Sequence, residues 1–190
     1  MALHHRIAMF ALVGAALLPA TDAEAQDPQF GANDIPTVFY ISKSYDKNRV
    51  DYGIRLDGRC APVRDEAVFQ YWRHFQPPDN GTQTHLLGTF EYIPYGISEQ
   101  RSLHKTLTGG VHLMKLRQFD KTPIAIITKK EADGKCTSQA RAVINGKESE
   151  LTYIYVKLGK GGLVPSVDWV EVHGKDLETG ADIVARMNKP

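Results

Sequence analysis

From Thr37 onwards, apolar residues recur at every second position of the chain. In residues 50–57, for example, valine, tyrosine, isoleucine and leucine alternate with aspartate, glycine, arginine and aspartate. Successive side chains of a strand point to opposite faces of a sheet, so this alternation predicts strands with one buried and one solvated face. Because no strand–helix–strand rhythm accompanies it, we expect a mainly β, antiparallel fold, built either as a sandwich or as a closed barrel.

The alternation predicts eight or nine strands in total. Asn145-Gly146 is the strongest hairpin signal, because both residues tolerate the positive φ of a type I′ turn. In Glu148–Leu158 apolar residues fall on both faces, which predicts a strand covered on two sides. The segments expected as strands are 37–43, 50–56, 67–76, 111–119, 123–130, 137–144, 148–158, 167–173 and 182–187.

One segment departs from this pattern. In Thr84–Ile93 the apolar residues follow a spacing of one, three and three, which fits a short helix better than a strand. Thr84 can act as its N-cap and Pro94 would end it. We therefore predict one short helix here.

The start of the chain predicts export. Arg6 precedes an apolar run over Ile7–Leu18, which is shorter than the roughly 20 residues that span a bilayer. Ala23-Glu24-Ala25 follows as a small–x–small cleavage site. We predict a cleaved signal peptide at 1–25, a flexible leader at 26–36 and a single β-rich domain at 37–190. An uncleaved anchor or a buried helix is the alternative. The exported protein would be periplasmic or extracellular, without a transmembrane segment in its mature chain.

The charge balance argues against nucleic acid as a partner. The formal net charge is +1, and loss of Arg6, Asp22 and Glu24 with the signal segment makes it +2. No basic run in the mature chain exceeds two residues. Electrostatic binding to phosphates needs a clustered positive face, which this composition does not indicate.

The two cysteines, Cys60 and Cys136, both follow the signal segment. An even pair in an oxidising compartment favours a disulfide. Two unrelated buried thiols are the alternative. Neither cysteine has a histidine or another cysteine at metal-ligand spacing.

The histidines of the mature chain show no metal-binding spacing. None forms an HxH, HxxxH or HExxH pair, and we therefore predict neither a metal nor a cofactor. His74 and His112 both fall in predicted strands and could meet across a sheet, a pairing more typical of surface residues. The mature histidines are His74, His85, His104, His112 and His173.

The GxSxG pattern of nucleophilic catalysis is also missing, and neither cysteine stands beside a histidine. Residues 159–162, GKGG, resemble a phosphate loop but lack the following Ser or Thr. Asp51, Asp168 and Glu171 lie on predicted strands. Together with His74 and His112, these three carboxylates are the only side chains that we identify as candidates for acid–base catalysis. A carboxylate at any outward-facing strand position would show the same pattern, so the pattern does not identify a site.

Tyrosines and tryptophans are the more informative residues. Each combines an apolar body with one polar group, which suits a ligand cavity, although strands also favour rings for packing. In the aromatic stretch 67–76, period two places Tyr71, Arg73 and Phe75 on one face, while Trp72 lies on the other and is expected to pack. The candidate ligand-binding residues are Lys43, Tyr71, Trp72, Arg73 and Tyr95.

Several short motifs are shared with one bacterial family. They are residues 39–44 (FYISKS) with Asn48, then Tyr71-Trp72, Tyr95-Gly96, Gly174-Lys175-Asp176 and Thr179-Gly180. In their order and spacing, over approximately 37–187, the chain resembles the uncharacterised domain of unknown function 4833. The resemblance implies an exported, β-rich domain and brings no activity or catalytic residue.

These observations favour a non-enzymatic binding module for a small or lipid-like ligand. Cations would meet an anionic group of the ligand, and rings would cover its apolar part. A cell-envelope hydrolase and a protein–protein interaction or scaffold domain are the alternatives. The expected partner is a small molecule or a component of the cell envelope.

Overall fold

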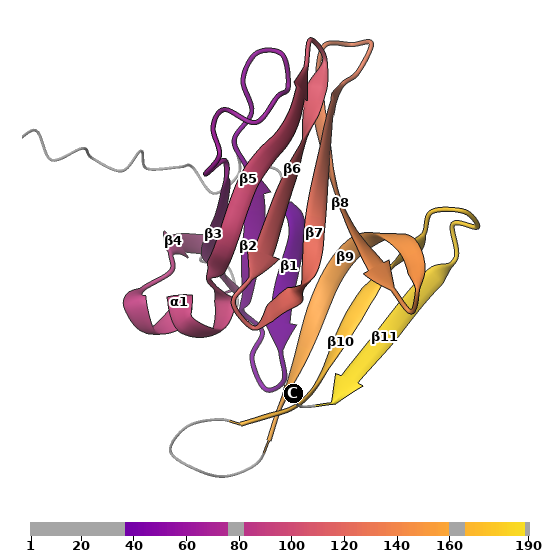
Figure 1. Ribbon diagram of the computed structural model, residues 1–190. Helices are drawn as coiled ribbons and strands as arrows, with labels where there is room; N and C mark the ends of the chain where they lie inside the picture. The colour runs from indigo at the N-terminus through magenta and orange to yellow at the C-terminus, as the bar shows by residue number, and fades with distance from the viewer. Residues whose placement is uncertain (1–36, 76–81, 160–165, 189–190) are drawn as a thin grey trace, which may run out of the picture.

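A computed structural model describes residues 37–75, 82–159 and 166–188 as a curled, mainly β structure with one short helix (Figure 1). The predicted signal peptide and leader lie outside the described residues and stay predictions. The elements are β1 (Thr37–Lys43), β2 (Arg49–Ile54), β3 (Val68–Phe75), β4 (Thr82–Leu86), α1 (Thr89–Tyr95), β5 (Ile97–Thr106), β6 (Gly109–Leu116), β7 (Phe119–Lys130), β8 (Cys136–Ile144), β9 (Lys147–Leu158), β10 (Val167–Asp176) and β11 (Asp182–Asn188).

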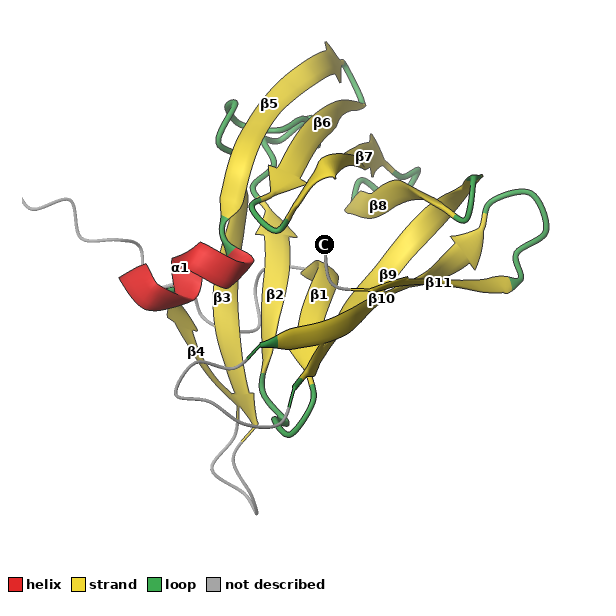
Figure 2. Cartoon of the chain, turned by 60° about the horizontal axis from the view of Figure 1, so that its bottom comes forward, coloured by secondary structure: helices red, strands yellow, loops and turns green. Residues whose placement is uncertain are grey.

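The strands form one sheet in the order β4-β3-β2-β1-β9-β8-β7-β6-β5, and β10 and β11 continue from β9. The long strand β9 is the junction. Its first half pairs with β8 and its second half with β1, while β10 pairs along most of its length. Strand β9 therefore has three neighbours, and the sheet as a whole curls into an open half-barrel (Figure 2).

The expectation of a strictly antiparallel sheet is wrong at one pairing. Strand β1 runs parallel to β9, with Tyr40 opposite Tyr153 and Lys43 opposite Val156. Parallel neighbours need a crossover connection instead of a hairpin. Here the connection contains every element from β2 to β8, so no local sequence pattern indicates the contact.

The nine predicted strands are present, eight of them with shifted ends, and two further strands, β4 and β5, accompany them among the described residues. Strand β5 shows no apolar alternation because most of its side chains are exposed. Strand β4 occupies the beginning of the predicted helix, since Thr84 pairs with Arg73 of β3.

The predicted helix exists, but its bounds were wrong. It begins after Gly88, whose backbone N–H donates to Glu91 Oε2 at 2.8 Å, and Pro94 lies inside it. Pro94 supplies no N–H to the carbonyl of Phe90 four residues earlier, and the helix ends one residue after it. No residue of α1 is buried, and Phe90 is 88 % exposed. The helical spacing of apolar residues in this segment therefore does not correspond to a helix face that is buried in the core.

The hydrophobic core lies within the curl of the sheet. Phe39 of β1 and Tyr52 of β2 stack there with ring centroids 4.4 Å apart, and both are fully buried. Trp72 is buried in the same core, which confirms that it packs. The other large buried members are Ile41, Val50, Ile54, Val68, Ile97, Met114, Leu116, Ile124, Ile126, Leu151, Ile154, Val156 and Val170.

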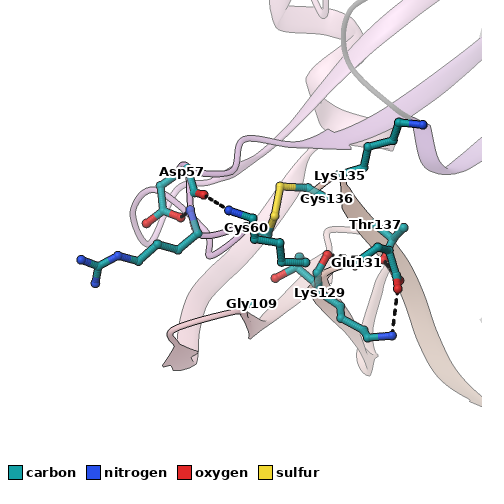
Figure 3. The surroundings of a disulfide bond; sticks show 12 residues. Asp57, Cys60, Gly109, Lys129, Glu131, Lys135, Cys136 and Thr137 are labelled. Atoms are coloured by element: carbon teal, nitrogen blue, oxygen red, sulfur yellow. Dashed lines mark hydrogen bonds and ion pairs between the residues drawn. A yellow bond between two sulfur atoms is a disulfide. The ribbon is translucent and has the colours of Figure 1, made fainter. Parts of the chain in front are cut away.

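The predicted disulfide is confirmed. Cys60, in the loop after β2, is bonded to Cys136 at the start of β8, across a sequence separation of 76 residues (Figure 3). Lys130 Nζ also donates to the Gly58 carbonyl at 3.1 Å. Both links fasten the loop between β2 and β3 to the β7–β8 hairpin.

No helix among the described residues is long and apolar enough to cross a membrane.

Candidate ligand-binding site

Three of the predicted ligand-binding residues meet at one end of the sheet. Lys43 Nζ lies 5.0 Å from the centroid of the Trp72 ring, and the Tyr95 ring packs edge-on against Trp72 at 5.6 Å. They come from the end of β1, the middle of β3 and the end of α1. We call Lys43, Trp72 and Tyr95 the Trp72 cluster. It brings together a cation and two rings, and its role as a ligand site stays a prediction.

The indole nitrogen of Trp72 has no hydrogen-bond partner in the part of the chain that the structure describes. The Trp72 side chain is 5 % exposed, and no described residue places an acceptor within reach of its buried Nε1 atom. Leaving a buried donor unpaired costs about 1–3 kcal/mol. Most buried polar groups in folded proteins are paired, so this one requires a reason. An acceptor supplied from outside the chain would satisfy it.

Lys43 adds a positive charge over the face of the Trp72 ring. Its ammonium forms an ion pair with Asp46 at 3.1 Å, and about a quarter of the side chain is exposed. This i,i+3 pair is partly exposed to water, and the stabilisation that it contributes is correspondingly modest. The Lys43 ammonium therefore lies between the Asp46 carboxylate and the face of the Trp72 ring.

Tyr95 is held in place from the interior of the fold. The hydroxyl of the fully buried Tyr52 donates to the Tyr95 carbonyl oxygen at 2.6 Å, which fastens the end of α1 to β2. Burial raises the pKa of Tyr95 to about 12, and the charges of Asp46 and Glu91 add to this. Its phenol is therefore neutral at ordinary pH and can donate a hydrogen bond.

The other two predicted ligand-binding residues, Tyr71 and Arg73, lie on the opposite face of β3. Arg73 Nε donates to Asp51 Oδ2 at 2.5 Å, and one terminal nitrogen of Arg73 donates to the Tyr71 hydroxyl at 3.1 Å. Arg49 Nε donates to the other Asp51 oxygen at 2.6 Å. The polar groups of Arg49, Asp51, Arg73 and Tyr71 are therefore paired with one another. The five predicted ligand-binding residues fall into two sets, which are the Trp72 cluster and the pair Tyr71 and Arg73.

Sequence reasoning missed an aromatic row on that opposite face. Tyr40 stacks on Tyr153 at 5.2 Å, and Tyr153 stacks on His173 at 4.2 Å. The row depends on the parallel pairing of β1 with β9, which places Tyr40 directly opposite Tyr153. Only knowledge of that pairing would have found it.

The candidate carboxylates do not converge. Asp51 is buried between two arginines, whereas Asp168 is exposed on β10. Glu171 Oε1 accepts from Arg186 at 2.6 Å, and this bond lowers the pKa of Glu171, with His173 adding to the effect. Asp51 and Glu171 therefore each accept a hydrogen bond from an arginine side chain.

The expectation that His74 and His112 could meet across a sheet is wrong. His112 of β6 is fully buried between Gln100, whose Oε1 lies 3.1 Å from Nε2, and Ser102, whose Oγ lies 3.3 Å from Nδ1. His74 instead contacts His85 of β4. Among the described residues no group of three or more His, Cys, Asp or Glu side chains could hold a metal ion.

Several shared motif residues have structural roles. The Leu158 N–H donates to Ser44 Oγ at 2.9 Å, which joins the end of β9 to the end of β1. Asp176 Oδ1 accepts from the Glu178 N–H at 2.8 Å in the turn between β10 and β11. A Cβ atom on Gly174 would collide with a backbone oxygen of β9, so only glycine fits there.

No curated protein and no solved structure matches the chain. One family model does, and it extends from Phe39 in β1 to Arg186 in β11. It is described as "Domain of unknown function (DUF4833)". Its match covers residues 39–186, and the chain therefore belongs to this family.

Proposed function

We propose that the protein is an exported binding module that holds a small, lipid-like ligand with an anionic or hydrogen-bond-accepting group at the Trp72 cluster. The single observation that carries the proposal is the buried Trp72 Nε1 without an acceptor, beside the Lys43 ammonium. A carboxylate or phosphate oxygen would accept from the indole and pair with the cation at the same time. A neutral Tyr95 hydroxyl is available as a further donor.

The surroundings of the cluster suit an apolar ligand chain. Phe90 and Ile93 of α1 are exposed by 88 % and 57 %. The same helix carries Tyr95 at its end. Large apolar side chains left in water next to a polar anchor are typical of surfaces that bind an amphipathic molecule.

Native mass spectrometry of protein purified from its own compartment tests the proposal. We expect an additional mass of a small amphipathic molecule on the wild-type protein and its loss in Trp72→Phe and Lys43→Met. Lys157→Met is the matched control, because Lys157 lies over the Tyr45 ring at 4.7 Å, outside the cluster. Ligand-free protein in every preparation would contradict the proposal, and a co-purifying protein would favour the scaffold alternative.

Fluorescence of Trp72 gives an independent measurement of ligand binding. The chain has two tryptophans, so Trp169→Phe leaves Trp72 as the only indole emitter. We expect dodecanoate to shift the Trp72 emission saturably, and dodecanol to do so more weakly, because the alcohol lacks the negative charge that Lys43 would pair. Equal, non-saturating responses to the two would show that no anion-selective site exists at Trp72.

A further inference from the structure

His74 of β3 and His85 of β4 bring two ring nitrogens together at the surface. Their Nε2 atoms are 3.3 Å apart, their ring centroids 4.8 Å apart, and their planes are inclined by 83°. The β3–β4 register explains the contact. Trp72 lies opposite His85, so His74 is the diagonal neighbour of His85 on the same face of the hairpin.

The distance between the nitrogens is the one that a metal ion requires. Imidazole nitrogens bind zinc at about 2.0–2.1 Å in tetrahedral geometry, which places two of them about 3.3 Å apart. Histidine joins a metal through a neutral ring nitrogen, and the Nε2 atoms of His74 and His85 are close enough to bind one ion together. Sequence motifs such as HxxxH do not reveal this pair, because a strand register joins the two residues.

We propose that His74 and His85 form a binding site for a divalent transition metal of the zinc and copper class, with solvent in the remaining positions. Imidazole is a ligand of borderline softness and suits these ions better than magnesium or calcium. His85 is exposed and His74 half-buried, so solvent reaches both rings. The site is independent of the ligand proposed for the Trp72 cluster, although the His74 and Trp72 ring centroids are only 5.8 Å apart.

The direct test is calorimetric titration of the full-length exported protein, purified without a polyhistidine tag and stripped with EDTA, with zinc chloride at pH 7.5. We expect one zinc ion per chain. His74→Gln and His85→Gln should each weaken zinc binding by at least about tenfold. His104→Gln is the matched control, because His104 is exposed on β5 outside the pair, and it should leave the affinity unchanged.

Nuclear magnetic resonance keeps the proposal testable if a variant misfolds. In the wild-type protein, zinc should shift the ring resonances of His74 and His85 and leave those of His104 in place. Copper(II) should quench the emission of Trp72 in the Trp169→Phe background. Zinc affinity unchanged in both single variants, or ring resonances that do not respond to zinc, would show that the two rings share only a proton, as in an N–H···N hydrogen bond.

Discussion

Arg73 donates from Nε to Oδ2 of Asp51 at 2.5 Å, and the carboxylate that accepts this bond has no exposed surface. Thr37 Oγ1 donates to the same oxygen at 3.0 Å, and Arg49 covers the other one. A buried carboxylate is stable only when its charge and its lone pairs are matched in this way. The contacts join β1, β2 and β3 on the face opposite the core.

The first prediction concerns this charge. Asp51→Asn should lower the free energy of unfolding by about 3 kcal/mol, because it leaves two guanidinium groups with no anion between them. Urea unfolding followed by circular dichroism measures the change. Asp182→Asn is the control, since it removes the exposed Lys175–Asp182 pair and should cost at most about 0.5 kcal/mol. Equal losses in the two variants would contradict a stabilising role for Asp51.

The second prediction concerns the disulfide. Reduction, or the double variant Cys60→Ser/Cys136→Ser, should lower the free energy of unfolding by about 4 kcal/mol, the loop entropy expected for a 76-residue separation. Urea unfolding with and without a reductant measures it. The double variant supplies the control, because reductant should not alter its midpoint. A wild-type midpoint insensitive to reductant would show that the bond contributes nothing.

The local pattern of apolar and turn residues in the sequence was sufficient to predict most of the strands. Alternation located β1 from its first to its last residue, and the type I′ signal at Asn145-Gly146 lies in the turn between β8 and β9, where both residues have positive φ. Strand β5 was not predicted because its mostly exposed side chains show no period-two alternation of apolar residues. The parallel pairing of β1 with β9 could not be predicted because it joins segments far apart in the chain and depends on the curl of the whole sheet.

The sequence indicates candidate residues for a site, but not how they group. The chemistry of Lys43, Trp72 and Tyr95 makes them candidates, and the structure places them in one cluster whose ligand binding stays a prediction. Arg73 follows Trp72 directly in the chain, but neighbouring residues of a strand point to opposite faces. The Arg73 side chain therefore donates to Asp51 and does not join Trp72. Chain spacing also gave no sign of the His74–His85 contact, which depends on the register of β3 with β4.

The third prediction is a pH dependence due to His112. Burial lowers the pKa of His112, Lys105 acts in the same direction, and Asp65 opposes them. The unfolded chain therefore binds more protons than the native state once the pH falls below about 6.5. Stability should decrease as the pH falls through that value, and the decrease should level off below the native pKa.

Urea unfolding between pH 8 and pH 4 tests this, with His112→Asn and the exposed His104→Asn compared at each pH. The decrease should be smaller in His112→Asn and fully present in His104→Asn. Nuclear magnetic resonance titration of the His112 ring in the wild-type protein gives the native pKa directly, whether or not the variant folds. A ring that titrates at or above 6.5 would refute the prediction.

The fourth prediction concerns Asp176, the last residue of β10. Its carboxylate accepts from Lys147 Nζ at 2.6 Å, and this bond, followed by the backbone N–H groups of Glu178 and Thr179, lowers the pKa of Asp176 to about 2. A depressed native pKa means that the stabilisation is complete above the unfolded pKa of about 3.9. It should be lost as the pH falls from about 4 through 2.

Carboxyl ¹³C titration of the wild-type protein and of Lys147→Met measures this effect. Removing Lys147 removes the largest cause of the shift, so the midpoint of Asp176 should rise towards the ordinary value near 3.8. Lys135→Met, which breaks the exposed Lys135–Asp133 pair, should leave the midpoint unchanged. If the Asp176 midpoint in Lys147→Met stays near 2, the two backbone N–H groups alone hold the carboxylate, and Lys147 has no part in stabilising the β10–β11 turn.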